Sequence, residues 1–192
     1  MYAIIEGVDT CGKSTQIELL KKRFKEAVFT KEPGGTKMGE KLRELLLEGE
    51  VTSKNAELFL FLADRAEHYE RIVKPNREDR LVISDRGFIS GIAYAITNQS
   101  TIGADKLIEL NLLSIDNNPP EIVFLLITNE DLIRERLRQK EHDNIEKRGI
   151  EYLLNVQNSM RYTLLKMGIK YIEIDASKSK SEIHDIITKA LS

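Results

Sequence analysis

Short apolar segments alternate with longer amphipathic segments along the chain. The short segments have the length and the β-branched content of buried strands, whereas the longer ones repeat apolar residues at helical spacing. Strands are predicted at 2–6, 27–31, 80–84, 122–127 and 170–174, and helices at 14–26, 56–73, 131–140, 149–167 and 181–191. This alternation predicts an α/β fold in which five parallel strands form one sheet flanked by crossover helices.

Length, charge and cysteine content narrow the class of protein. The chain has 192 residues, a formal net charge of −2 and a single cysteine, Cys11. This length fits one domain over 1–192. The small net charge gives no reason to expect nucleic acid as a partner, and no apolar run reaches the length of about 18 residues that a membrane helix needs. A lone cysteine excludes an intramolecular disulfide and fits a reducing compartment, so we expect a cytoplasmic protein.

The segment GVDTCGKS, Gly7–Ser14, matches the phosphate-loop pattern G-x-x-x-x-G-K-[ST] at every defined position. It lies between a predicted strand and a predicted helix, as the pattern requires, and its backbone N–H groups should bind phosphate oxygens. Lys13 is expected to reach the β- and γ-phosphates and Ser14 to ligate Mg²⁺. The residues expected to bind ATP or GTP are Gly7, Val8, Asp9, Thr10, Cys11, Gly12, Lys13, Ser14 and Thr15. The alternative is a glycine-rich turn with an accidental GKS.

A second polar group follows the predicted strand 80–84, where Asp85 and Arg86 would lie at the carboxyl edge of the sheet. Open α/β sheets bind ligands at this edge. Asp85 is therefore a candidate ligand for Mg²⁺ or its water, and Arg86 a candidate cation that stabilises charge during phosphoryl transfer. The alternative is that the two residues form an ion pair on the surface.

The helix predicted over 56–73 carries Phe61 and Arg65 one turn apart, so an aromatic ring and a guanidinium would project from the same face. This pair suits a nucleoside monophosphate, because the ring can stack on a base while the guanidinium binds phosphate. The alternative is that Phe61 belongs to the core and that Arg65 pairs in solvent with Asp64 or Glu67. Periodicity alone does not separate the two interpretations.

Taken together, these segments resemble the bacterial thymidylate kinases, members of the P-loop nucleoside-monophosphate kinase family. The matching segments are EGVDTCGKSTQ (6–16), KEPGGTKMGEKLREL (31–45), FLADRAEH (61–68), ISDRGFISGIAY (83–94), NPPEIVFLLIT (118–128) and YIEIDAS (171–177). The resemblance implies a three-layer fold with a mobile lid at approximately 134–149. It also implies transfer of the γ-phosphoryl group of ATP to dTMP with Mg²⁺, and a homodimer joined through helix faces such as 55–73.

The resemblance further implies roles for individual residues. Lys13, Arg86 and Asp9 would be catalytic, with Asp9 near the sugar hydroxyl and phosphate of dTMP. Phe61 would stack on thymine, and Asp175–Ser177 would lie near the adenine. The residues implied to bind dTMP are Asp9, Glu32, Pro33, Phe61, Arg65, Arg86, Ser90 and Tyr94, and those implied to hold the metal are Ser14 and Asp85.

The chain departs from the family pattern at four positions. Gly87 replaces a tyrosine and Ala95 a glutamine, and both changes are expected to touch the acceptor pocket. Ile127 stands in place of an aspartate near the nucleotide, and Asn144 in place of the lid arginine. Basic residues that could supply a lid cation are Arg134, Arg136, Arg138, Lys140, Lys147 and Arg148, of which Arg138 and Arg148 are the preferred candidates; mixed charges of this kind also occur on solvated helix faces.

Two other functions stay open on the sequence. Because Gly87 and Ala95 lack the side chains usual in the family, the chain could instead be a kinase of another nucleoside monophosphate or of a deoxynucleoside. A GTP-dependent switch is less well supported, because the segment Thr128–Asp131 has Glu130 where a guanine-reading motif needs lysine. The three histidines, His68, His142 and His184, have no shared metal-binding spacing and are expected to be surface or helix histidines.

Overall fold

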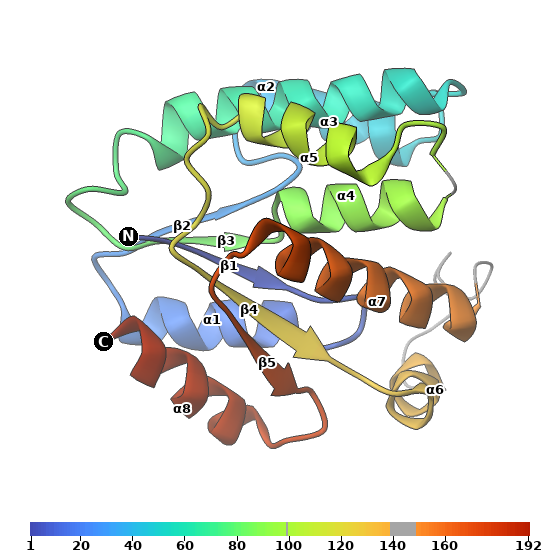
Figure 1. Ribbon diagram of the computed structural model, residues 1–192. Helices are drawn as coiled ribbons and strands as arrows, with labels where there is room; N and C mark the ends of the chain where they lie inside the picture. Colours follow the sequence, from blue (N-terminus) through green and yellow to red (C-terminus); the bar gives the residue numbers. More distant parts are fainter. Residues whose placement is uncertain (99, 139–148) are drawn as a thin grey trace.

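The structure is a computed structural model that describes residues 1–98, 100–138 and 149–192. Five parallel strands form one sheet in the order β2-β3-β1-β4-β5 (Figure 1). The strands are β1 Tyr2–Glu6, β2 Val28–Lys31, β3 Val82–Asp85, β4 Ile122–Ile127 and β5 Tyr171–Asp175. The prediction of a five-stranded parallel sheet is thus confirmed, and each predicted strand lies within two residues of its observed bounds.

Helices cover both faces of the sheet, which confirms the three-layer α/β arrangement (Figure 1). On one face α1 and α8 pack against Ala3 and Ile5, and on the other α4, α5 and α7 pack against Tyr2 and Ile4. The helices are α1 Lys13–Arg23, α2 Lys37–Leu47, α3 Lys54–His68, α4 Phe88–Thr97, α5 Ala104–Leu113, α6 Glu130–Arg138, α7 Ile150–Met167 and α8 Lys180–Leu191.

The central strand β1 explains why the sheet places a site at its carboxyl edge. Its Ala3, Ile4 and Ile5 have no exposed surface, because parallel strands covered on both faces bury alternate side chains in two different clusters. Strand β1 pairs with β3 on one side and β4 on the other. The loops that leave β1 and β3 therefore lie next to each other at the same edge, where such sheets bind ligands.

Periodicity did not predict three of the helices, α2, α4 and α5. The α4 sequence FISGIAYAIT is apolar on nearly all sides, because the helix is buried between the sheet, α3, α5 and α7, and so it lacks the amphipathic repeat of a surface helix. The helix predicted over 56–73 ends at His68 as an α-helix, and Tyr69–Val73 continue it as a π-helical turn. In the described part of the chain, no helix is both long and apolar enough to cross a membrane.

Candidate active site

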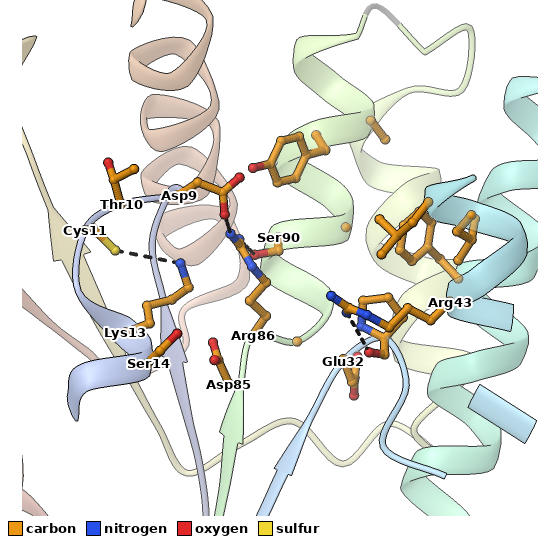
Figure 2. Close-up of a pocket in the computed structure, with 18 of the residues that line it drawn as sticks. Asp9, Thr10, Cys11, Lys13, Ser14, Glu32, Arg43, Asp85, Arg86 and Ser90 are labelled. Atoms are coloured by element: carbon orange, nitrogen blue, oxygen red, sulfur yellow. Dashed lines mark hydrogen bonds and ion pairs between the residues drawn. The ribbon is translucent and has the colours of Figure 1, made fainter. Parts of the chain in front are cut away.

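A cavity of about 1360 Å³ opens at the carboxyl edge of β1, β2 and β3 (Figure 2). It brings together nearly all the site residues that the sequence predicts. The predicted residues that line it are Asp9, Thr10, Cys11, Gly12, Lys13, Ser14, Thr15, Glu32, Pro33, Phe61, Arg65, Asp85, Arg86, Ser90 and Tyr94. Gly7 and Val8 lie behind this surface, and the Val8 side chain belongs to the core.

The phosphate loop joins β1 to the N-terminus of α1. Gly12 takes the left-handed conformation at φ 100°, and α1 begins there without a side-chain cap. By contrast, α2, α3 and α8 are capped by the side chains of Thr36, Ser53 and Ser179. The first-turn N–H groups of α1 are thus left for another acceptor, and a helix N-terminus of this kind favours an anion.

Lys13 lies across the inside of this loop. Its Nζ donates to the carbonyl oxygens of Gly7 and Val8, each at 2.9 Å, and lies 3.8 Å from Sγ of Cys11 (Figure 2). The ammonium group is therefore held on the cavity side of the loop, although the residue is only 7% exposed. Cys11 is buried against Gly7, where a Cβ would meet its sulfur at 2.6 Å, so it packs as the small residue that a tight loop tolerates.

Arg86 connects the phosphate loop to α4. Its Nη2 lies 2.5 Å from Oδ1 of Asp9, and its Nη1 donates to the carbonyl of Gly7 at 3.1 Å and to Oγ of Ser90 at 3.0 Å (Figure 2). The surface pair of Asp85 with Arg86 is therefore the wrong alternative, since the partner of Arg86 is Asp9. Burial disfavours the guanidinium charge, but the Asp9 carboxylate outweighs it and raises the pKa of Arg86.

The turn that carries Arg86 depends on Glu6, a residue that the sequence analysis did not single out. The buried Glu6 carboxylate accepts hydrogen bonds from the backbone N–H groups of Gly87 at 2.9 Å and Ser90 at 3.1 Å, and from Oγ of Ser90 at 2.5 Å. It caps α4, which has no cap of its own. Burial raises the pKa of Glu6 despite these bonds. Because Arg86 has φ 67°, an uncommon conformation, this anchoring helps to fix it.

The residues present fit a bound Mg²⁺ at the phosphate end of the cavity. Oδ1 of Asp85 is buried without a hydrogen-bond partner among the described residues, which is costly unless a ligand satisfies it. Ser14 lines the same cavity, and Figure 2 places both side chains below Lys13 in that view. In the described ranges there is no cluster of three His, Cys, Asp or Glu side chains that could hold a metal ion alone. A metal here would therefore share its coordination with water or phosphate oxygens, as Mg²⁺ does.

At the opposite end of the cavity, Arg65 is buried and fixed on two sides. Its Nε donates to Oε2 of Glu32 at 2.8 Å, and its Nη1 donates to Oδ1 of Asn111. The residue is 3% exposed, so the alternative in which it pairs with Asp64 or Glu67 in solvent is wrong. Burial opposes the negative charge on Glu32, but Arg65 and His68 outweigh burial and lower its pKa.

His68 is the last residue of α3, in agreement with the expectation of a surface or helix histidine, and it lies behind the cavity. It has no exposed surface, its Nδ1 lies 2.8 Å from Oε1 of Glu32, and its Nε2 lies 2.7 Å from Oγ1 of Thr30. Asp64 accepts a hydrogen bond from the backbone N–H of Gly34 at 3.0 Å and so fixes the loop that follows β2. The spacing of residues 64, 65 and 68 on α3 is a signal that could have indicated a shared polar face. His184 lies on α8, and His142 lies outside the described residues.

Gly87 and Ala95, the two departures expected to touch the acceptor pocket, both line the cavity. Ala95 lines the cavity with a methyl group. Gly87 also lines the cavity, and a Cβ there would lie 2.7 Å from Cδ1 of Ile4, so a side chain at this position would begin against the core. Tyr94 lies between them on α4, and burial raises its pKa to about 12 against the opposite effect of Arg86.

Arg136 is the cation of α6 that the structure places over the phosphate loop. Its Nη1 donates to the carbonyl of Thr10 at 2.8 Å and its Nη2 to the carbonyl of Ala176 at 2.7 Å. It therefore joins the loop to the segment after β5. The lid predicted at 134–149 falls largely outside the described residues, as do Asn144, Arg148 and the side chain of Arg138.

Comparisons with known proteins agree with this geometry. A family model described as thymidylate kinase matches residues 5–187. The chain belongs to the thymidylate kinase family. The thymidylate kinase of Aliarcobacter butzleri is 54% identical over 183 residues, which cover 95% of this chain and 94% of that protein. The thymidylate kinase of Sulfurovum sp. is 49% identical over 187 residues, covering 97% of each chain.

A solved structure shows the same relationship. The crystal structure of thymidylate kinase from Ehrlichia chaffeensis matches with a TM-score of 0.78 and 29% identity, covering 100% of this chain and 98% of that one. Membership of the thymidylate kinase family makes the chain a nucleotide kinase, whose reaction is the phosphorylation of dTMP to dTDP.

Proposed function

We propose that the cavity binds ATP at its phosphate-loop end and dTMP between α3 and α4, and that the γ-phosphoryl group is transferred between them beside Arg86. The single observation that carries this proposal is the position of Arg86. Its guanidinium contacts Asp9 and Gly7 of the phosphate loop and Ser90 of α4, so it lies where the two ends of the cavity meet.

The donor end would bind the triphosphate through the backbone of Asp9–Thr15, the uncapped start of α1 and Lys13. The alignment of several N–H groups with a buried ammonium supplies the positive potential that phosphates require. The nucleoside part of ATP would be bordered by Arg136, which is hydrogen-bonded to the loop, and by Asp175–Ser177. Arg138 and Arg148 stay predicted lid cations.

The acceptor end would place the base against Phe61 and the phosphate near Arg86. Arg65, Glu32, Pro33, Ser90 and Tyr94 line this end. With its Nε and Nη1 already engaged by Glu32 and Asn111, Arg65 offers the cavity mainly Nη2. It therefore suits a single hydrogen bond to the substrate better than a bidentate contact with a phosphate group.

The chemistry needs alignment and charge stabilisation. An oxygen of the dTMP phosphate, already ionised, forms a bond to the γ-phosphorus, the bond to the β-bridging oxygen breaks, and ADP leaves; no general base is required. Lys13 and Arg86 would stabilise the charge on the transferred group. Ser14 and Asp85 would hold Mg²⁺, which when bound supplies charge neutralisation at the phosphates. Asp9 would orient Arg86 and face the sugar side of dTMP.

We also propose a homodimer and a cytoplasmic location. Large apolar side chains are exposed on α2 and α3, namely Met38, Leu45, Leu47 and Phe59. Large apolar side chains exposed on packed neighbouring helices are common at interfaces between subunits. Light scattering on the wild type and on Phe59→Glu tests this part: a shift from dimer to monomer in the variant supports it, and a monomeric wild type refutes it.

Steady-state kinetics with ATP and a panel of dTMP, dUMP, dCMP, dGMP and thymidine test the activity. Arg86→Ala should lower kcat by at least about a thousandfold while ATP binding, measured by calorimetry, is retained. Arg80→Ala provides a control, because Arg80 is exposed and away from the cavity. Near-normal turnover of dTMP by Arg86→Ala would contradict the role of Arg86, and preference of the wild type for another acceptor would contradict the substrate.

A further inference from the structure

One face of α4 forms a wall of the acceptor end of the cavity. Its cavity-lining residues are Ser90, Gly91, Tyr94, Ala95 and Asn98, where Asn98 is the C-cap of the helix. Positions 91, 95 and 98 share a face, because residues three and four apart are neighbours on a helix. Glycine and alanine offer this face no polar group. The Asn98 carboxamide is therefore the polar group at the outer end of the wall.

The facing helix α3 runs antiparallel to α4 along this wall. A Cβ at Gly91 would lie 3.3 Å from Nη2 of Arg65, whereas at the other end Nζ of Lys54 donates to the backbone carbonyl of Asn98 at 2.8 Å. Phe61 lies between Arg65 and Lys54 on α3 and lines the cavity. A ring stacked on Phe61 would consequently have Arg65 beyond one edge and Asn98 beyond the other.

The spacing fits a pyrimidine. Asn98 lies seven positions after Gly91, which corresponds to a rise of about 10 Å along the helix. A pyrimidine ring with a hydrogen bond of about 2.9 Å at each of its two carbonyl oxygens spans a similar length. The wall therefore has room for a pyrimidine that is bonded at one end by Arg65 and at the other by Asn98.

The orientation of the Asn98 carboxamide is set by Tyr152 of α7. The Tyr152 hydroxyl donates to Oδ1 of Asn98 at 2.8 Å, and its ring packs against that of Tyr94 with centroids 6.3 Å apart. With its oxygen engaged, the carboxamide presents its NH₂ group, a donor that complements a carbonyl oxygen. The position and the chemistry of Asn98 thus both suit the oxygen-bearing edge of thymine.

We propose that Asn98 determines base specificity by donating a hydrogen bond to a ring carbonyl of dTMP, at the end of the wall where Ala95 provides none. This inference rests on the proposed placement of dTMP between α3 and α4. It assigns Tyr152 as a positioning residue, which acts by holding the Asn98 oxygen. It also explains how the pocket can bind a base through polar contacts when residue 95 is alanine.

The decisive variant is Asn98→Asp. Aspartate keeps an acceptor for the Tyr152 hydroxyl but replaces the NH₂ donor by an oxygen. If Asn98 donates to the base, the KM for dTMP should rise at least about tenfold, while kcat, the KM for ATP and the melting temperature change little. Asn158→Asp, an exposed change of the same charge on α7, should leave all of these values unchanged.

A rescue variant distinguishes base reading from a structural role. Asn98→Ala should also raise the KM for dTMP about tenfold. Adding Ala95→Gln, which places a longer carboxamide one turn earlier on the same face, should recover most of that loss. Wild-type KM values in Asn98→Asp, or a parallel rise in the KM for ATP with a lower melting temperature, would overturn the assignment of Asn98 while leaving dTMP kinase activity in place. A wild type that does not phosphorylate dTMP would refute both proposals.

Discussion

Nη1 of Arg65 donates a hydrogen bond to Oδ1 of Asn111, and both residues are buried. The Asn111 amide in turn donates to the carbonyl of Leu107 at 2.6 Å, so the carboxamide is fixed on α5. Together with Glu32, Asn111 prevents the guanidinium from rotating and sets which amino group reaches the cavity. On the proposed placement of dTMP, helix α5 would therefore contribute to acceptor binding, although Asn111 does not line the cavity.

Replacing Asn111 should weaken acceptor binding selectively. Asn111→Leu removes the acceptor and leaves one Arg65 N–H group unsatisfied, so the KM for dTMP should rise about tenfold and the melting temperature should fall. Asn111→Asp keeps an oxygen facing Arg65 and should hold the KM within about threefold of wild type. Kinetics with each substrate varied in turn measure both values. An equal rise in the KM for ATP would show that Asn111 supports only the fold.

Asp9→Asn keeps the size of the side chain but removes the charge that faces Arg86. The ion pair at 2.5 Å becomes a hydrogen bond from the charged guanidinium to a neutral carboxamide oxygen, so the guanidinium is held less firmly beside the acceptor. We expect kcat/KM for dTMP to fall about a hundredfold, with ATP affinity within about threefold of wild type. Asp185→Asn, an exposed change on α8, is the matched control. Equal damage to both substrates would mean that Asp9 only stabilises the loop.

Glu6→Gln tests whether the α4 cap supports catalysis. A carboxamide offers one oxygen where the carboxylate uses both for Gly87 and Ser90, so at least one buried N–H or O–H group loses its acceptor. Denaturant unfolding should show a loss of about 1–3 kcal/mol. Turnover of dTMP should also fall, because the turn that carries Arg86 is loosened. Stability equal to that of the wild type would show that this cap is not needed.

The acid dependence of stability should report on Glu32. Its pKa is lowered below 4.5 in the folded protein, so its stabilising contribution is fully present above about pH 4.5 and is lost as the pH falls through the lowered pKa. Glu32→Gln should therefore be less stable than wild type at pH 7, and the difference should shrink as the pH falls below 4.5. Chemical unfolding across this range measures it. A difference independent of pH would contradict the ionised Glu32.

Most of the fold could be predicted from the sequence, because most of its elements have a local sequence pattern. The strands are continuous apolar runs and the phosphate loop is a contiguous motif, so both could be predicted from neighbouring residues. Helix α4 could not, because its burial on several sides removes the amphipathic repeat.

The site residues that belong to a contiguous motif could be predicted from the sequence. The contacts that they make with residues far away in the sequence could not. Arg86 was expected to stabilise charge during phosphoryl transfer, with a surface pair to Asp85 as the alternative. Its charged partner, Asp9, lies 77 positions earlier and could not be predicted from neighbouring residues. His68 was expected as a surface or helix histidine; it ends α3, but its partners Glu32 and Thr30 come from a separate segment. From the sequence, Glu6 is only the last residue of a strand; its role as the cap of α4 depends on the position of that helix. These partners depend on sheet order, which no local pattern contains.

Helix α4 carries Ser90, Gly91, Tyr94, Ala95 and Asn98 into one cavity from a single rigid segment anchored by Glu6. Inserting or deleting one residue near its start would rotate every later side chain by about 100° and withdraw the whole wall from the ligand at once. This wall of the cavity can therefore change its chemistry by exchanging side chains, one position at a time, but not by changing the length of this helix.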